Sequence, residues 1–190
     1  MKTRHVSQSA RGLVSVLGLL SVLALLTGSA AAQCGNPATS NFPTHITVCP
    51  SGDIAVVGQV LDAAGNPCVG SVVHMQFQPP ATGALYPMPG FPFPLLTSTT
   101  NLNGFVSFHP HVGGSCLNGA VTFYDPSGVI LGTAMTINSP DMNADGCVNL
   151  ADISLFASVY YGSYSGNADF NMDGVLNLTD VGILAQHLGH

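Results

Sequence analysis

DMNADGCVNLAD, residues 141–152, is followed 28 positions later by a near-copy, DFNMDGVLNLTD, residues 169–180. The chain has nine acidic residues, all of them Asp, and six of these lie in the two stretches. The other three are Asp53, Asp62 and Asp125. Only 6% of the residues are charged, so this concentration of carboxylates indicates a site that needs them.

Both stretches match the ligand pattern of an EF-hand-type calcium loop, which takes oxygens from positions 1, 3, 5, 7, 9 and 12 and has Gly at position 6. Calcium prefers six to eight oxygen ligands, and alternate positions of a tight loop converge such oxygens on one point. The pattern therefore predicts two bound Ca²⁺ ions. Their ligands would be Asp141, Asn143, Asp145, the main-chain carbonyl of Cys147, Asn149 and Asp152 in the first loop, and Asp169, Asn171, Asp173, the carbonyl of Val175, Asn177 and Asp180 in the second.

Three carboxylates give each empty loop a charge of about −3, which a bound calcium ion reduces to about −1. Because the carboxylates repel one another without the ion, we expect calcium binding and folding of this region to be coupled. Val148 and Leu176, both at position 8, are expected to pair the loops through a short strand contact.

An amphipathic helix is predicted after each loop, over residues 150–161 and 178–188, because apolar residues recur there at helical spacing. The recurring apolar residues are Leu150, Ile153, Phe156, Ala157 and Tyr160 in the first helix and Leu178, Val181, Leu184 and Leu188 in the second. Neither loop has a clear entering helix, and position 12 is Asp rather than Glu. With the duplicated D-x-N-x-D-G-x-(V/L)-N-L-x-D frame, these features make residues 140–190 resemble the type I dockerin.

The resemblance implies a calcium-dependent module of near-twofold symmetry that plugs into a cohesin domain. Partner-contact positions 10 and 11 hold Leu150 and Ala151 in one copy and Leu178 and Thr179 in the other, where dockerins often have Ser or Thr. Ser158, Val159, Gln186 and His187 stand where many dockerins have Lys or Arg. The calcium frame is thus retained, whereas the usual cohesin-recognition surface is not.

The first 32 residues read as a signal peptide. A positive start that includes Lys2 and Arg4 precedes an apolar core over residues 13–26, and Ala30-Ala31-Ala32 offers a cleavage site. The core is too short for a comfortable membrane span, which needs about 20 residues. We therefore expect a secreted protein, extracellular or on the cell surface of a bacterium, with no transmembrane segment after cleavage.

All three basic residues of the chain lie within the predicted signal peptide, the third being Arg11. Nucleic-acid binding needs basic side chains to displace phosphate counterions, so this function is excluded. A surface built from uncharged polar residues has little electrostatic repulsion to keep copies apart. It favours a protein that packs against a partner, including another copy of itself, although a monomer with an uncharged surface is the alternative.

Residues 33–138 are predicted to form an all-β domain. Short apolar segments alternate with Gly-, Asn- and Pro-containing turns, which indicates six or seven strands in a β-sandwich. The stretches VVGQVLDAAGNPCVGSVVHMQF, residues 56–77, and TSTTNLNGFVSFH, residues 97–109, resemble bacterial immunoglobulin-like and carboxypeptidase-regulatory-like domains. This resemblance implies a stalk, spacer, adhesive or carbohydrate-contacting module rather than an enzyme.

Five cysteines fit an exported protein in an oxidising compartment. Cys34, Cys49, Cys68 and Cys116 lie in the β region and could form two disulfides in three connectivities. We favour Cys34 with Cys49 and Cys68 with Cys116. For Cys147, an intermolecular disulfide, a free thiol and a bridge to the first domain stay open.

The segment over residues 78–94 is rich in Pro and apolar residues and is predicted to be a long, stiff loop. It would be either a contact surface, through Tyr86, Phe91 and Phe93, or a plain strand connection folded over one end of the sandwich.

Catalysis is not expected. A glycosidase needs two carboxylates beside the scissile bond, and two of the three Asp outside the loops, Asp62 and Asp125, lie in turn motifs. His74, His109 and His111 suggest either a transition-metal site or ordinary surface histidines.

The sequence thus predicts a multidomain chain, in which an all-β immunoglobulin-like sandwich, residues 33–138, precedes a small α-helical dockerin-like EF-hand pair, residues 139–190. The expected function is a secreted, non-catalytic assembly protein that docks onto a protein partner, in particular a neighbouring copy in a filament or surface layer. The alternative is a cohesin-binding component of a polysaccharide-degrading complex, with a sandwich that binds carbohydrate or a cell surface.

Overall fold

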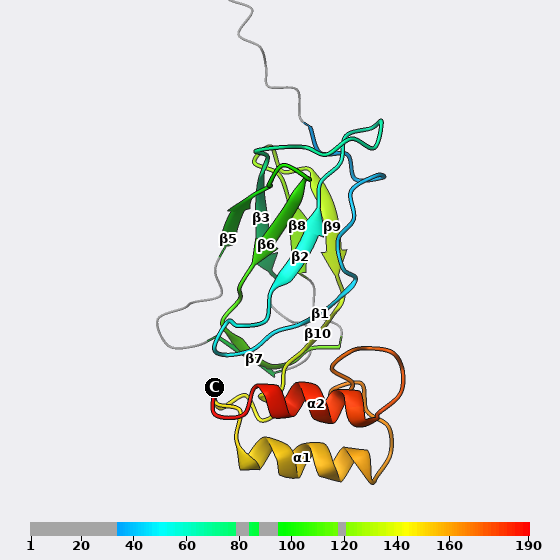
Figure 1. Cartoon of the computed structure of the whole chain (residues 1–190). Coiled ribbons are helices and arrows are strands. Elements are labelled where there is room, and N and C mark those ends of the chain that lie inside the picture. Colours follow the sequence, from blue (N-terminus) through cyan, green and yellow to red (C-terminus); the bar gives the residue numbers. More distant parts are fainter. Residues whose placement is uncertain (1–33, 79–83, 88–94, 118–120) are drawn as a thin grey trace, which may run out of the picture. The chain divides into compact units, whose positions relative to one another are not determined.

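The computed structural model describes residues 34–78, 84–87, 95–117 and 121–190 (Figure 1). The predicted signal peptide, Phe91 and Phe93 lie outside these residues. Residues 34–190 form one compact unit. The described part of this unit is mostly β-strand, with two short helices near its C-terminal end.

In the described residues, ten strands form four sheets. The strands are β1 (His45–Thr47), β2 (Val56–Gln59), β3 (Val72–Phe77), β4 (Ala84–Pro87), β5 (Leu95–Thr99), β6 (Phe105–Phe108), β7 (Val112–Ser115), β8 (Val121–Tyr124), β9 (Ile130–Ala134) and β10 (Thr136–Asn138). The largest sheet has the order β5-β3-β8-β9, and its neighbours are antiparallel. The pairs β2-β6 and β4-β7 are antiparallel, and β1-β10 is parallel.

The β2-β6 pair lies over the four-stranded sheet (Figure 1), and their facing side chains share one core. Val73, Met75 and Phe77 alternate with more exposed residues along β3 and contribute to this core. Phe123 of β8 stacks on Phe42 with ring centroids 4.6 Å apart. The alternation of buried and more exposed side chains along β3 is typical of a strand with one buried face.

Two of the three acidic residues outside the loops close turns. The Asp62 carboxylate accepts hydrogen bonds from the backbone N–H of Ala64 and Asn66, both at 2.8 Å. The Asp125 carboxylate accepts them from Ser127 and Val129, both at 2.9 Å. These are Asx-type turns, in agreement with the turn motifs in the sequence.

The strand count of six or seven was too low. The segment over 78–94 was predicted to be a loop, but residues 84–87 form β4 and pair with β7. Gly113 and Gly114 give β7 little strand character in the sequence. In addition, the stretch over residues 129–137 is divided at Met135, whose N–H donates to the Thr44 carbonyl. The residues before Met135 form β9 and pair with β8, and the residues after it form β10 and pair with β1.

The favoured disulfide pairing was also wrong. Cys34 is bonded to Cys68, with the two Cα atoms 5.6 Å apart, and Cys49 and Cys116 are not disulfide-bonded. A backbone hydrogen bond from the Asn36 N–H to the Leu61 carbonyl and one from the Cys68 N–H to the Val60 carbonyl bring the N-terminal segment close to the turn that precedes β3. Cys49 belongs instead to a second apolar cluster, formed with residues of the C-terminal region.

That second cluster holds the helices α1 (Leu150–Tyr160) and α2 (Leu178–Gln186). The rings of Phe156 in α1 and Phe170 stack with their centroids 5.8 Å apart, and Leu184 of α2 is buried in the same cluster. Leu150 and Leu178, the first apolar residues of the two helical patterns, are each 77% exposed. Both are the first residue of their helix, where the side chain has no preceding turn to cover.

Each helix begins with a capping box. Asn149 caps α1 and Asp152 is its third residue, and Asn177 and Asp180 have the same roles in α2. Positions 9 and 12 of the predicted calcium loops therefore also start the helices. Residues 138–140, at the boundary between the two predicted domains, are buried, because Asn138 ends β10 and its side-chain amide donates to the Asp169 carbonyl at 2.7 Å.

Candidate functional site

The first residue of each acidic loop is a buried carboxylate that organises the loop backbone. Asp141 accepts hydrogen bonds from the N–H of Asp145 at 3.1 Å and Gly146 at 2.9 Å. Asp169 accepts the equivalent bonds from Asp173 at 3.2 Å and Gly174 at 2.8 Å. The chain is thereby curled around the carboxylate in the same way in both loops.

The last residue of each loop is a second buried carboxylate. Asp152 accepts from the N–H of Met142 at 2.8 Å, Asn143 at 3.2 Å and Asn149 at 2.8 Å. In the second loop Asp180 accepts from Phe170 at 2.9 Å, Asn171 at 3.3 Å and Asn177 at 3.0 Å. These bonds tie the two ends of each loop together.

The third and fifth positions form the exposed rim. The Asn143 side-chain amide donates to the Asp145 carboxylate at 2.8 Å, and Asn171 donates to Asp173 at 2.8 Å. At the ninth position, the amides of Asn149 and Asn177 point to the carbonyls of Cys147 and Val175, each at 3.3 Å. All twelve predicted ligand positions thus take part in hydrogen bonds within their own loops, and their assignment as calcium ligands stays a prediction.

The turn geometry is the same in the two loops. Ala144 and Met172, both at position 4, have positive φ angles of 59° and 56°, and they are the two non-Gly residues with positive φ in the described part of the chain. Gly146 and Gly174 follow with φ angles of 91° and 85°. Left-handed backbone is costly for a side-chain-bearing residue and tends to occur where function requires it.

The donor set fits a hard cation. Carboxylate, amide and main-chain oxygens are the ligands that calcium prefers, and each predicted position offers one such oxygen. Burial, together with the neighbouring charges of Asp152 and Asp145, raises the pKa of Asp141 to about 6, against the hydrogen bonds from Gly146 and Asp145 that lower it. A cation among these carboxylates would relieve both effects.

Position 8 does not join the loops as expected. Val148 is fully buried, but its N–H donates to the His190 carbonyl and its carbonyl accepts from Gly189, both at 2.8 Å. Because both backbone groups of Val148 are used by the C-terminal residues, a ladder to Leu176 does not form there. Leu176 packs against the second apolar cluster instead.

The predicted partner-contact residues are exposed where the structure describes them. These are Leu150 and Ala151 at the start of α1 and Leu178 and Thr179 at the start of α2. An apolar surface pocket of about 350 Å³ lies between the helices and is lined by Ile153, Phe156, Tyr160, Leu178, Val181 and Leu188, among others. Tyr86 lies in β4, but its side chain is outside the described residues, like Phe91 and Phe93.

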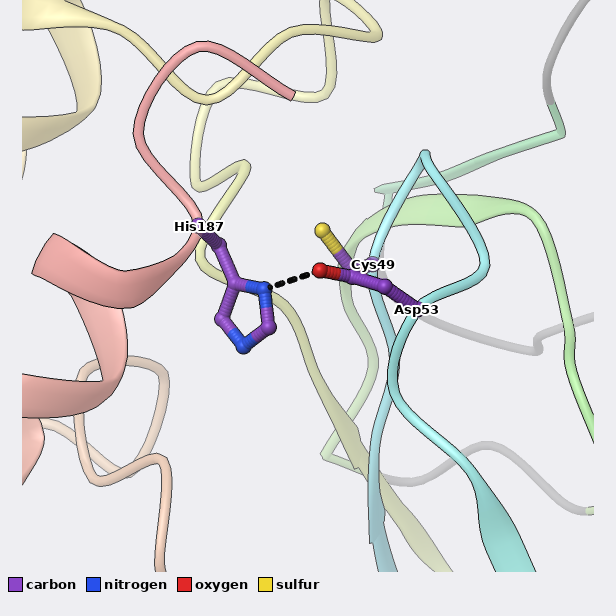
Figure 2. A group of neighbouring side chains, drawn as sticks. All are labelled: Cys49, Asp53 and His187. Carbon is purple, nitrogen blue, oxygen red and sulfur yellow. Dashed lines mark hydrogen bonds and ion pairs between the residues drawn. The ribbon is translucent and has the colours of Figure 1, made fainter.

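The three histidines singled out in the sequence have separate partners. His74 contacts Thr97 at 2.9 Å, whereas His109 and His111 contact the carbonyls of Gly52 and Pro50, each at 3.0 Å. In the described residues, the group of three potential metal ligands is a different one, formed by Cys49, Asp53 and His187 (Figure 2). Periodicity and motif spacing could not reveal it, because Asp53 and His187 are 134 positions apart.

No protein-family model matches this sequence, and no curated protein matches it. Among solved structures, the "D0-D1 domain of Intimin" is similar to it at 15% sequence identity with a TM-score of 0.31. The match covers 54% of this chain and 49% of that chain, so this chain spans about half of the intimin chain it matches.

Within the described residues, neither helix combines the length and apolar character needed to cross a bilayer. The Cys34–Cys68 disulfide is typical of a protein from an oxidising compartment.

Proposed function

We propose that this chain is a secreted, non-catalytic calcium-binding assembly protein. Its C-terminal region, residues 139–190, would act as a dockerin-like module that binds two Ca²⁺ ions and docks onto a protein partner. The β region, residues 33–138, would act as an immunoglobulin-like spacer or surface-contacting domain.

The observation that carries this proposal is the repeated hydrogen-bond scheme of the two loops. In each, the first carboxylate accepts from the fifth and sixth backbone N–H groups, and the twelfth accepts from the second, third and ninth. Acidic turns that resembled ligand spacing by chance would have no reason to share this scheme or the left-handed fourth residue.

The helices give the partner a surface. Leu150 and Leu178, each 77% exposed, stand directly after the ion loops, so the loop conformation fixes where these side chains point. A loop emptied of calcium would lose this alignment, which makes docking calcium-dependent.

We favour a neighbouring copy of the chain as the partner. The described residues include no Lys or Arg, so little electrostatic repulsion separates copies, and the surface pocket between the helices is almost wholly apolar. Head-to-tail contacts of this kind give filaments unless their rotation closes a ring. The alternative is a cohesin-binding component of a polysaccharide-degrading complex, with the β domain binding carbohydrate or a cell surface.

Thermal unfolding with and without calcium tests the calcium part of the proposal. We expect Tm to rise when calcium is added to the wild-type protein, because a ligand that binds only the folded state stabilises it. Asp141→Ala together with Asp169→Ala should abolish the rise. Asp62→Ala, in a turn outside the loops, is the matched control and should keep it. An undiminished rise in the double variant would refute the ligand assignment.

Negative-stain imaging and size-exclusion chromatography in calcium and in chelator test the docking part. Polymers that form in calcium without an added partner, and dissolve in chelator, would support self-assembly. Monomers under both conditions that capture a cohesin domain would overturn self-assembly and establish the alternative.

A further inference from the structure

A second, chemically different ligand cluster lies where the turn after β1 meets the end of α2 (Figure 2). The ligand atoms of Cys49, Asp53 and His187 lie within 4.8 Å of one another. The Nδ1 atom of His187 is 2.7 Å from an Asp53 carboxylate oxygen, and the Nδ1 atom of His190 is 2.9 Å from the same oxygen. Three side chains of metal-binding type therefore lie together, and His190 contacts the Asp53 oxygen from outside this group of three.

We propose that Cys49, Asp53 and His187 form a binding site for a divalent transition-metal ion of the zinc class, and that rotation of His190, which contacts the same Asp53 oxygen, brings it in as the fourth ligand. One thiolate, one carboxylate and two imidazoles are a four-ligand set that suits tetrahedral zinc. Sulfur and nitrogen ligands select such ions over calcium, so this site differs from the acidic loops in the ion that it would bind.

The distances are compatible with this assignment. Ligand atoms around a tetrahedral zinc ion are about 3.3–3.8 Å apart, as follows from metal–ligand bonds of about 2.0–2.3 Å. The histidine–aspartate contacts are somewhat shorter than this and the whole cluster is somewhat wider. Rotations of exposed side chains would accommodate the ion, since Asp53 and His190 have side-chain exposures of 33% and 43%.

The surroundings provide outer-shell support. The Ser51 hydroxyl contacts the Cys49 sulfur at 3.3 Å and is also hydrogen-bonded to the Asp53 carboxylate. Partners of this kind orient metal ligands. The backbone of His190 is fixed by Val148, so the histidine is held near the cluster.

Metal binding would require the Cys49 thiol to lose its proton. Burial raises the pKa of this thiol to about 11, so the ion must displace the proton, and apparent affinity should increase with pH. An ion bound here would link the turn after β1 to the C-terminal end of α2. This metal-mediated cross-link would lie in a different part of the protein from the Cys34–Cys68 disulfide.

Cobalt(II) titration tests the site. The protein is kept reduced and saturated with calcium, and Cys147→Ser is used as the background because Cys147 is an exposed thiol outside the cluster. We expect one equivalent of cobalt to bind with visible absorption bands and a thiolate-to-cobalt charge-transfer band. Zinc should displace it.

Variants assign the ligands. Cys49→Ser should remove the charge-transfer band, and His187→Gln should weaken cobalt binding at least tenfold. His74→Gln, outside the cluster, is the matched control and should leave binding unchanged. If Cys49→Ser fails to fold, the more exposed Asp53→Asn and His187→Gln decide the question. Absence of a charge-transfer band, or binding unchanged in both of these variants, would overturn the proposal.

Discussion

Gly113 of β7 lies directly against Asp141 of the first acidic loop. A Cβ atom at this position would lie 1.9 Å from the Asp141 carboxylate. Next to it, the Gly114 N–H donates to the Asp141 carbonyl at 2.8 Å. Because Asp141 is fully buried, it cannot move away from an added methyl group without disturbing the loop.

We therefore expect Gly113→Ala to destabilise the protein by about 1–3 kcal/mol, the usual cost of overpacking, and to weaken calcium binding at the first loop. Gly182→Ala is the matched control, since a Cβ atom there meets nothing within 4 Å and Ala favours a helix. Calcium titration and thermal unfolding of both variants measure the difference. Equal behaviour of the two variants would show that the close approach of Gly113 and Asp141 is not required.

The Cys49 thiol gives the protein a second residue-scale signature, at alkaline pH. Burial raises its folded-state pKa from 9.0 to about 11. Between these values the unfolded chain has lost the proton and the folded chain has not, so stability falls as pH rises. The described residues include no Lys, so no ammonium group there titrates in the same range.

We predict a steeper loss of unfolding free energy between pH 9 and 11 in metal-free wild-type protein than in Cys49→Ala. Chemical denaturation at several pH values measures the slope. Cys147→Ala, at an exposed position, is the control and should keep the wild-type slope. A Cys49→Ala slope as steep as that of the wild type would contradict the assignment to Cys49.

At the scale of elements, the two helices were the most predictable part of the fold. Asn at loop position 9 is also the helix N-cap, and Asp at position 12 is also the third helical residue of the capping box. One sequence pattern therefore specifies both the loop and the start of the helix. Strands such as β3 were also predictable from local sequence, because each is a short apolar segment bounded by turn residues.

Elements that depend on distant partners were not predictable. The strand β7 contains two glycines and is a strand only because β4 pairs with it. Val148 was predicted to pair with Leu176 because both stand at loop position 8. Its backbone N–H and carbonyl are instead hydrogen-bonded to His190 and Gly189. Cys34 pairs with Cys68 because backbone bonds near Leu61 bring them together, and the spacing of cysteines has no information on this.

The disulfide fixes the N-terminal segment to the hairpin before β3, across a sequence separation of 34 residues. Closing a loop of this length stabilises a folded protein by about 4 kcal/mol in the chain-entropy description. We expect Cys34→Ala together with Cys68→Ala to lower the free energy of unfolding by a value of this order, measured by denaturant titration in calcium. The calcium stoichiometry should not change, because neither cysteine belongs to the cluster that holds the helices. A loss of calcium binding would contradict this separation.

At the scale of the whole molecule, the acidic loops and the β region share hydrogen bonds. Thr47 of β1 donates to the Phe170 carbonyl at 2.5 Å, and Asn138 of β10 donates to the Asp169 carbonyl at 2.7 Å. Both bonds involve the start of the second loop. Calcium bound there would therefore stabilise the end of the β region as well as the helices, and the two regions should unfold together.

Differential scanning calorimetry measures this coupling. We expect a single transition in saturating calcium, with a lower Tm in Asn138→Ala, which removes the donor to the second loop. Thr136→Ala, in the same strand but half-buried, is the control with a smaller expected effect. Two resolved transitions in the wild-type protein would contradict joint unfolding.

If the two acidic loops are calcium sites, the wild-type protein binds two ions, so counting the bound ions is the most decisive measurement. Isothermal titration of the purified protein, together with its Asp141→Ala, Asp169→Ala and double variants, gives the stoichiometry of each. The proposal predicts two ions per wild-type chain, one in each single variant and none in the double variant. A wild-type chain that binds no calcium, or a double variant that still binds two ions, would contradict it.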